Sequence, residues 1–342
     1  MQKLHWLREF VRQNIVQRSL LLGIASIGSI AILAGCESAD QTTAKTESVD
    51  LSKVTLVLGD QAGMTKAKVE ASKVLEGTPY KVRWASFQGA APLFEAVKAG
   101  SVDTAPAGDT PVLAAAASDV PIKIIATSVS SPEAVGILVQ QGSSIKKVED
   151  LKGKTVVVSS AKGSIAQYLL IEALKEAGLS TKDVNVKFVL PTDAAAAFQA
   201  GEIEVWATFD PYLAIAEKNG GRLLRSGKDI NTGLGFITAS DAALQDPGKR
   251  AALEDVIKRI SKAWEWENKH KKEYINIYSD ITKLPKDVSE TINGRVNAEV
   301  RAVTDQDITA VQKVADVFMD EGVLAKPVKV AKIVDKDIFK NK

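Results

Sequence analysis

The stretch TVVVSSAKGSIAQYLLIEALKEAG, residues 155–178, joins a predicted strand to a predicted helix through a turn of small residues. Its first part, 156–158, is a β-branched apolar run, and residues 159–164 turn the chain. Apolar side chains then recur at helical spacing up to Gly178, which predicts a helix over 165–177. Free backbone N–H groups at such a helix start favour an anionic oxygen. The stretch therefore predicts an α/β unit with a candidate anion site at its turn.

The same order of strand, turn and helix recurs on both sides of this stretch. This alternation predicts an α/β fold with a largely parallel sheet. Beyond Gly235 the pattern becomes mostly helical, and one long predicted helix carries Leu253, Ile260 and Trp264 on its apolar face. The predicted strands span 54–58, 82–87, 102–105, 122–127, 135–139, 155–160, 184–190, 205–209 and 236–239.

Two changes of pattern, near 133–136 and near 233–237, indicate domain boundaries. They predict a second lobe, residues 135–235, inserted into a first lobe made of 51–134 and 236–342. A chain of 342 residues is long enough for two such bodies. Because the chain crosses between the lobes twice, the crossings are expected to act as a hinge.

The N-terminal segment is read separately. A basic stretch to Arg18 precedes an apolar run over 20–33, and Leu-Ala-Gly-Cys at 33–36 resembles the bacterial lipobox. We therefore expect a lipoprotein signal peptide over 1–35, a lipid on Cys36, a flexible tether over 36–50 and localisation at the cell envelope. An uncleaved membrane anchor is the alternative. Outside 1–35 the formal charge is about −1, so nucleic acid is not an expected partner.

Residues for enzymatic or metal chemistry are scarce. His5 and His270 are the only histidines and Cys36 is the only cysteine, which leaves no catalytic triad, histidine metal site or disulfide framework. The charged segment around His270 is interpreted as a solvated helix face. No metal and no cofactor are predicted.

Polar turns precede most of the predicted helices. Because the carboxyl ends of parallel strands meet at one edge of a sheet, these turns are expected to line one cleft. Thr110 is expected to cap the helix that follows it. Ordinary helix capping remains the alternative for each turn taken singly. The turns contain Gln61, Gln88–Gly89, Gly108–Asp109–Thr110, Lys162–Gly163–Ser164, Thr192–Asp193 and Asp210.

Six stretches carry a resemblance to a known family: FQGAAPLFEAVKAG at 87–100, GDTP at 108–111, DLKGKTVV at 150–157, KGSIAQYLL at 162–170, LPTDAAAAFQAG at 190–201 and WATFDPY at 206–212. From about residue 51 to 339 the chain resembles the extracytoplasmic solute-binding proteins of ABC transporters, in the group that binds aliphatic sulfonates, taurine and nitrate. The resemblance implies a periplasmic-binding-protein type II-like α/β fold, with two Rossmann-like lobes joined by two hinge strands. By position it implies cleft residues Gln61, Gly89, Gly108, Asp109, Thr110, Lys162, Gly163, Ser164 and Asp210.

The resulting hypothesis is a lipid-anchored, monomeric binding protein for a small organic anion, an aliphatic sulfonate, which it delivers to an ABC permease and its ATPase. Backbone N–H groups and the hydroxyls of Thr110 and Ser164 would hold the sulfonate, and Phe87, Phe209 and Tyr212 would shape the pocket for the organic tail. Lys162 is expected to supply charge or to lie at the rim, and Asp109 to stabilise its turn or to face a substrate amine. Taurine, nitrate or a heterocyclic vitamin precursor remain alternative solutes. A desulfinase-like enzyme and a sensory lobe are alternatives of other classes.

Overall fold

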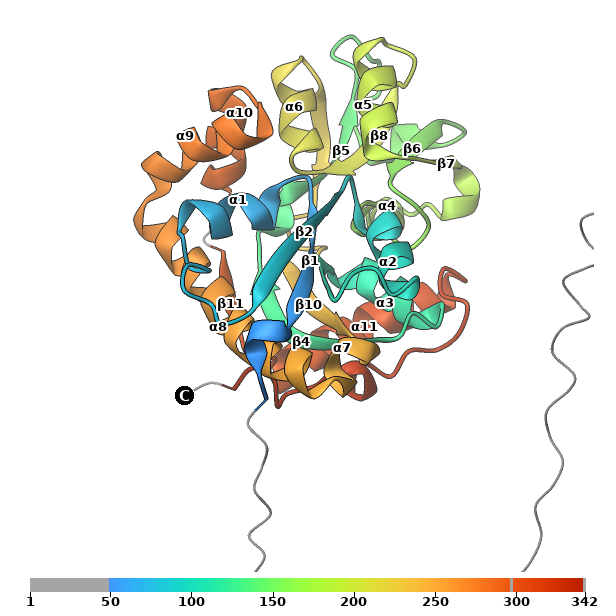
Figure 1. The fold of residues 1–342 in the computed structure, drawn as a ribbon. Coiled ribbons are helices and arrows are strands. Elements are labelled where there is room, and N and C mark those ends of the chain that lie inside the picture. The colour runs from blue at the N-terminus through green and yellow to red at the C-terminus, as the bar shows by residue number, and fades with distance from the viewer. Residues whose placement is uncertain (1–48, 296–297, 341–342) are drawn as a thin grey trace, which may run out of the picture. The chain divides into compact units, whose positions relative to one another are not determined.

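The computed structural model describes residues 49–295 and 298–340 (Figure 1). The predicted signal peptide, Cys36 and nearly all of the predicted tether lie outside the described residues. Within the described ranges, no helix combines the length and the apolar character needed to cross a membrane.

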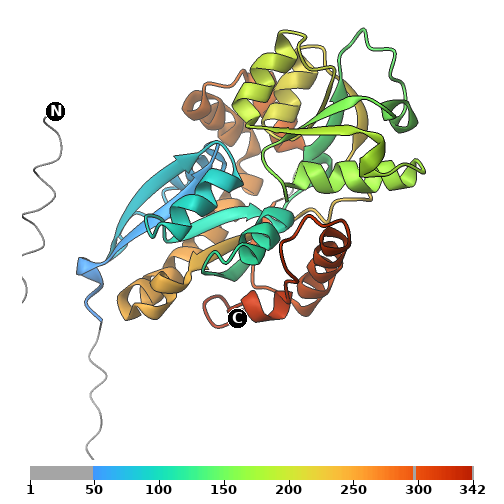
Figure 2. The same ribbon diagram turned by 90° about the vertical axis from the view of Figure 1, so that its right-hand side faces the viewer.

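Two β-sheets define two lobes. The sheet of lobe 1 has the strand order β11-β4-β10-β3-β1-β2, and that of lobe 2 has the order β7-β6-β8-β5-β9. In Figure 2 the green strands of lobe 2 form a layer separate from those of lobe 1. The strands of lobe 1 are β1 Thr55–Gln61, β2 Lys81–Phe87, β3 Thr104–Gly108, β4 Ile122–Val129, β10 Leu234–Ser240 and β11 Glu299–Arg301; those of lobe 2 are β5 Val135–Val139, β6 Thr155–Ser159, β7 Asn185–Val189, β8 Val205–Phe209 and β9 Arg222–Ser226.

Helices cover both faces of each sheet. In lobe 1, α2, α3 and α11 pack on one face, and α1, α7 and α8 pack on the other. In lobe 2, α4 packs on one face, and α5 and α6 on the other. The helices are α1 Met64–Ala71, α2 Ala90–Lys98, α3 Asp109–Ala117, α4 Ile165–Glu176, α5 Pro191–Gln199, α6 Tyr212–Lys218, α7 Asp241–Gln245, α8 Pro247–Lys269, α9 Lys271–Thr282, α10 Lys286–Gly294 and α11 Asp305–Asp320.

The expectation of a largely parallel sheet is wrong. β1 pairs in parallel with β2 and β3, and β6 with β7 and β8. The remaining pairs are antiparallel: β10 with β3 and β4, β11 with β4, and β5 with β8 and β9. The physical reason is the double crossing between lobes, since the strand that leaves a sheet and the strand that returns to it run in opposite directions. Local periodicity does not contain that information.

The two crossings lie side by side. The chain leaves lobe 1 after β4 and enters lobe 2 at β5, and it returns between β9 and β10. The Ser130 N–H donates to the Gly233 carbonyl at 2.7 Å, and the Gly227 N–H donates to the Val135 carbonyl at 2.8 Å. These bonds tie the two crossings into one narrow connection.

The stretch at 155–178 folds as its sequence predicts. Val156 and Val158 on β6 are fully buried against Leu169 and Leu170 of α4. The Ser164 hydroxyl caps α4 by accepting a hydrogen bond from the Gln167 N–H at 3.3 Å. The predicted helix over 165–177 is one residue longer than α4.

Other local predictions need correction. β1 continues to Gln61, through residues expected to form a turn, because Asp60 and Gln61 still pair with β2. The Asp60 carboxylate caps α1 by accepting from the N–H groups of Gly63, Thr65 and Lys66. Thr110 does not cap α3. That helix already begins at Asp109, and Gly108 is its N-cap residue.

Helices α9 and α10 contact both lobes, beside α1 and α6 (Figure 1). Tyr274, Tyr278 and Ile292 of these helices pack with Ala67 of α1 and with Ala214 of α6. The lobes therefore share an apolar contact in addition to the two crossings.

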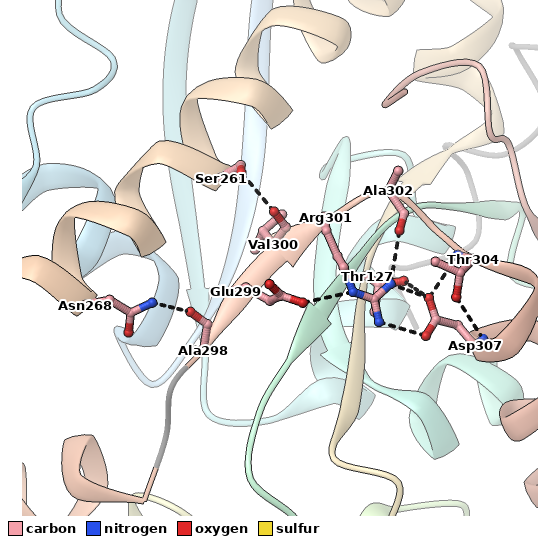
Figure 3. A network of polar contacts seen from close by, with 10 residues as sticks. All are labelled: Thr127, Ser261, Asn268, Ala298, Glu299, Val300, Arg301, Ala302, Thr304 and Asp307. Atoms are coloured by element: carbon pink, nitrogen blue, oxygen red, sulfur yellow. Dashed lines mark hydrogen bonds and ion pairs between the residues drawn. The ribbon is translucent and has the colours of Figure 1, made fainter. Parts of the chain in front are cut away.

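A polar network fixes the segment that follows α10 (Figure 3). Arg301 on β11 donates to both carboxylate oxygens of Asp307, at 2.6 and 2.9 Å, and the Thr127 hydroxyl of β4 donates to the same carboxylate at 3.0 Å. On the other side, α8 holds β11 through hydrogen bonds from Asn268 to the Ala298 carbonyl and from Ser261 to the Val300 carbonyl, both 2.8 Å. The network holds β11 at the edge of the lobe 1 sheet.

Candidate ligand-binding site between the lobes

A cavity of about 420 Å³ lies between the lobes. This volume falls in the usual range of sites for small organic ligands. Both lobes and the second crossing contribute to its wall. Of the residues predicted from the sequence, the cavity is lined by Gln61, Gln88, Gly108, Asp109, Lys162, Gly163, Ser164, Phe209 and Asp210, whereas Phe87, Gly89, Thr110, Thr192, Asp193 and Tyr212 are not part of its lining.

The lobes contact each other around this cavity in a closed arrangement. Tyr168 of α4 packs edge-on against Phe318 of α11, with ring centroids 5.6 Å apart. Lys162 Nζ donates to the Gly322 carbonyl at 2.7 Å, and the Tyr212 hydroxyl donates to the Gln88 carbonyl at 3.3 Å. Since each contact joins a lobe 2 residue to a lobe 1 residue, separating the lobes would break all of them.

The turn at 160–164 supplies hydrogen-bond donors. The backbone N–H groups of Ala161 and Lys162 donate to no acceptor among the described residues. Ser160 also lines the cavity. The Gly163 N–H, in contrast, donates to Gln167 Oε1 at 2.6 Å, and the Ser164 N–H donates to the Ala161 carbonyl, so the free donors of the turn precede Gly163.

Two glycines, Gly163 and Gly108, allow the lobes to approach closely. A Cβ at Gly163 would lie 2.5 Å from the Ala114 Cβ, and a Cβ at Gly108 would lie 2.7 Å from Ile165 Cγ2. A Cβ at Gly89 would lie in ordinary contact with Ser160. The first two distances are too short for any side chain, and each pair spans the lobes. The glycines thus act through lobe closure as well as through their turns.

Asp109 stabilises its own turn. One carboxylate oxygen accepts from the Thr110 N–H at 2.7 Å, and the other accepts from the Thr232 hydroxyl at 2.6 Å. Burial raises the pKa of Asp109 to about 6, although these hydrogen bonds favour the ionised form. Because Thr232 lies on the second crossing, Asp109 also connects α3 to the hinge.

Thr110 differs from the hypothesis, whereas Lys162 takes the second of its two expected positions. The Thr110 hydroxyl is fully buried and has no hydrogen-bond partner among the described residues. The Lys162 ammonium points to the rim, where it holds the end of α11 through the Gly322 carbonyl. The structure therefore places the Thr110 hydroxyl inside the cavity wall and the Lys162 ammonium at the cavity entrance.

Asp210 forms an ion pair across the cleft. Its carboxylate accepts two hydrogen bonds from Arg295 of lobe 1, at 2.7 and 2.8 Å, and one from the Ala214 N–H at 3.1 Å. Arg295 also pairs with Glu217 of α6. Burial raises the pKa of Asp210 to about 6, against the opposing effect of Arg295. Its negative charge is thus compensated within the wall.

Of the three predicted aromatic residues, Phe209 lines the cavity, whereas Phe87 and Tyr212 do not. Phe209 lines the cavity and makes an edge-on contact with Tyr212, with ring centroids 6.1 Å apart. Phe87 instead packs against the core of lobe 1. Gln61 lines the cavity while its amide donates to the Pro106 carbonyl at 2.6 Å, joining the ends of β1 and β3.

Sequence reasoning missed several residues of this site. Lys68 of α1 and Glu267 of α8 line the cavity, Arg295 at the end of α10 pairs with Asp210 of its wall, and Ser160 was treated only as part of a turn. The signal for Glu267 was available, because it lies seven residues after Ile260 and three after Trp264, on the apolar face of α8. Nothing in the local pattern marked Arg295. Among the described residues, no group of His, Cys, Asp and Glu side chains could hold a metal ion.

Two α/β lobes that close through a double crossing on a cavity between them define the class of two-lobed solute-binding proteins. The chain belongs to the NMT1/THI5-like family, whose model matches residues 86–272. It is 30% identical to an aliphatic sulfonates-binding protein of Escherichia coli, over 92% of this chain and 94% of that protein. It is also 30% identical to a protein of the same description from Bacillus subtilis, over 76% of this chain and 78% of the relative.

A solved structure supports the fold. The alkanesulfonate-binding protein of Xanthomonas axonopodis pv. citri, bound to MOPS, superposes with a TM-score of 0.77 at 31% identity. The match covers 82% of this chain and 98% of that chain. The two-lobed mixed α/β architecture is therefore that of periplasmic binding proteins.

Proposed function

We propose that this protein captures an aliphatic sulfonate between its lobes and delivers it to an ABC permease. The observation that carries the proposal is the turn at 160–164, which brings Ser160 and the free N–H groups of Ala161 and Lys162 to the cavity between the lobes. A sulfonate has three acceptor oxygens, and hydrogen bonds to a charged group contribute roughly 1.5 to 3 kcal/mol each. Several such bonds would supply the roughly 8 kcal/mol of micromolar binding.

The charges on the cavity wall are compatible with an anion. The buried carboxylates of Asp210 and Glu267 are paired with Arg295 and Lys68, and that of Asp109 accepts two hydrogen bonds. Pairing reduces the repulsion that bare carboxylates would exert on a sulfonate. A site made of donors would also favour a sulfonate over protonated phosphate, whose proton would lack an acceptor.

The relatives support binding rather than catalysis. Those that match most of the chain are named sulfonate-binding proteins. A desulfinase-like reaction through a cysteine nucleophile has no residue for it in the described lobes, since Cys36 is the only cysteine. Incubation with an aryl sulfinate is expected to give no sulfite, and its release would favour the enzyme.

A thermal-shift panel tests the choice of solute. Alkanesulfonates, MOPS, taurine, nitrate and a pyrimidine vitamin precursor would each be added to the purified protein. At about one hundred times its Kd, a ligand stabilises the folded state by roughly 2.7 kcal/mol, which is expected to raise Tm by about 5 °C. A rise with another solute and none with any sulfonate would contradict the proposal.

Export and anchoring complete the proposed role. The protein would be exported, lipid-modified at Cys36, held at the membrane as a monomer and able to dock on its permease. Expression in a bacterial host with a labelled fatty acid is expected to label the wild type and not the Cys36→Ser variant. Equal labelling of both would remove the anchor from the proposal without affecting ligand binding.

A further inference from the structure

A buried ion pair lies on the wall of the cavity, in lobe 1. Lys68 of α1 and Glu267 of α8 approach to 2.6 Å between Nζ and Oε2. Their side chains are only 10% and 6% exposed, and both residues line the cavity. The Lys68 ammonium also lies over the ring of Trp264, 4.9 Å from its centroid, and Trp264 lines the same cavity.

This pair lies away from the turn at 160–164. Helices α1 and α8 cover one face of the lobe 1 sheet, and Trp264 packs in the core on that face. The helix that follows the turn, α4, packs its Tyr168 and Ile171 into the core on the opposite face. The cavity therefore extends past the end of the sheet, with the donor turn toward one face and the ion pair toward the other.

The chemistry of the pair restricts what can lie against it. The pair has no net charge, so a second anion would meet the Glu267 carboxylate and a cation would meet the Lys68 ammonium. A plain hydrocarbon would cover both charged groups without offering a hydrogen bond, which is costly for buried polar groups. A neutral group that can both donate and accept satisfies the pair without repulsion. The Asn293 amide of α10, which also lines the cavity, adds to the polar character of the wall.

We propose that the Lys68–Glu267 pair is a subsite for the distal end of the ligand, and that the preferred ligand is a sulfonate whose tail ends in an uncharged hydrogen-bonding group such as a hydroxyl. This inference rests on the proposed function, which places the sulfonate at the turn of lobe 2. It adds the requirement that the distal end of the ligand carries an uncharged hydrogen-bonding group.

Isothermal titration calorimetry with matched ligands tests the inference. Hydroxyl-terminated alkanesulfonates of increasing length would each be compared with the alkanesulfonate in which a methyl group replaces the hydroxyl. At the length that reaches the pair, the hydroxyl compound is expected to bind about tenfold more tightly. The double variant Lys68→Met/Glu267→Gln, which leaves no unpaired buried charge, is expected to abolish this preference.

Two controls isolate the subsite. Ethanesulfonate is too short to reach both ends, so its affinity should be equal in the wild type and the double variant. Lys66→Met changes a partly exposed lysine on the same helix that does not line the cavity, and it should keep the hydroxyl preference. If the wild type binds sulfonates but prefers the hydroxyl at no length, or if the double variant keeps the preference, the subsite is overturned while the proposed function stands. If no sulfonate binds, the proposed function itself fails.

Discussion

Arg295 of lobe 1 holds Asp210 of lobe 2 with two hydrogen bonds, at 2.7 and 2.8 Å, across the cleft that the ligand must enter. The side chains of Arg295 and Asp210 are only 15% and 2% exposed, so the pair is weakly screened by water. The same guanidinium reaches Glu217. The Asp210 carboxylate on the cavity wall is therefore neutralised by Arg295 only when the lobes are closed.

Arg295→Ala is expected to weaken sulfonate binding by about tenfold or more. The variant leaves a buried carboxylate without its partner and also removes a contact that exists only between closed lobes. Calorimetry measures the loss of affinity. The control is Lys218→Ala, which breaks an exposed ion pair with Asp287 across the same lobes and should change the affinity less than about twofold. Equal losses in the two variants would contradict a special role for Arg295.

Gly163→Ala is expected to reduce affinity by about tenfold or more, because the new methyl group would collide with Ala114 of the other lobe when the lobes close. The φ of Gly163 is +87°, so alanine also strains the turn by about 1–2 kcal/mol. Gly178→Ala provides the matched control, since its φ is +70° and no atom lies within 4 Å of the added Cβ. Both variants should lose similar stability in urea, and only Gly163→Ala should lose affinity. Unchanged binding in Gly163→Ala would show that closure does not need this contact.

Compared with Asp109→Asn, the wild type is expected to gain about three- to tenfold in sulfonate affinity as the pH falls from about 7 to about 5. The comparison is needed because Asp210, whose pKa is also raised to about 6, titrates in both proteins. The pKa of buried Asp109 is raised to about 6, so the carboxyl on the cavity wall becomes neutral in this range while the sulfonate stays ionised. The same shift means that the folded state binds the proton more tightly than the unfolded state. Its contribution to stability is therefore present at low pH and is lost as the pH rises from about 4 through about 6. Calorimetry at several pH values measures both profiles, and equal profiles in the wild type and Asp109→Asn would assign the dependence to another group.

Asp307→Asn is expected to cost about 2 kcal/mol of stability at neutral pH. Burial opposes ionisation of Asp307, but hydrogen bonds from Arg301, the Thr304 backbone and Thr127 lower its pKa from 3.8 to about 2 (Figure 3). A lowered pKa stabilises the folded protein above about pH 4, and this stabilisation is lost as the pH falls toward 2. Urea denaturation should therefore show a cost that shrinks in acid. Asp305→Asn, at an exposed position on the same helix, should cost little at any pH.

Local sequence pattern predicted the parts of the site that are built locally. The strand, turn and cap at 155–178 depend on neighbours in the chain, so the spacing of Val156, Ser164 and Leu169 was enough. The antiparallel pairs depend on which strands cross between lobes, and no pattern along one strand records that. Arg295 lies 85 residues from Asp210, beyond any helical period. The position of Glu267 on the apolar face of α8 could have predicted a buried residue, but its charge led to its assignment to a solvated helix face.

The rim contacts of α11 have a consequence outside the cavity. Lys162 donates to the Gly322 carbonyl, and Lys175 forms an ion pair with Glu321 at 3.1 Å; both contacts lie at the protein surface. When the lobes separate, these two lysines and the end of α11 face water instead of each other. These rim contacts are therefore present at the surface when the cleft is closed and absent when it is open. A partner protein that contacts both sides of this rim could distinguish the closed from the open form without contacting the bound ligand.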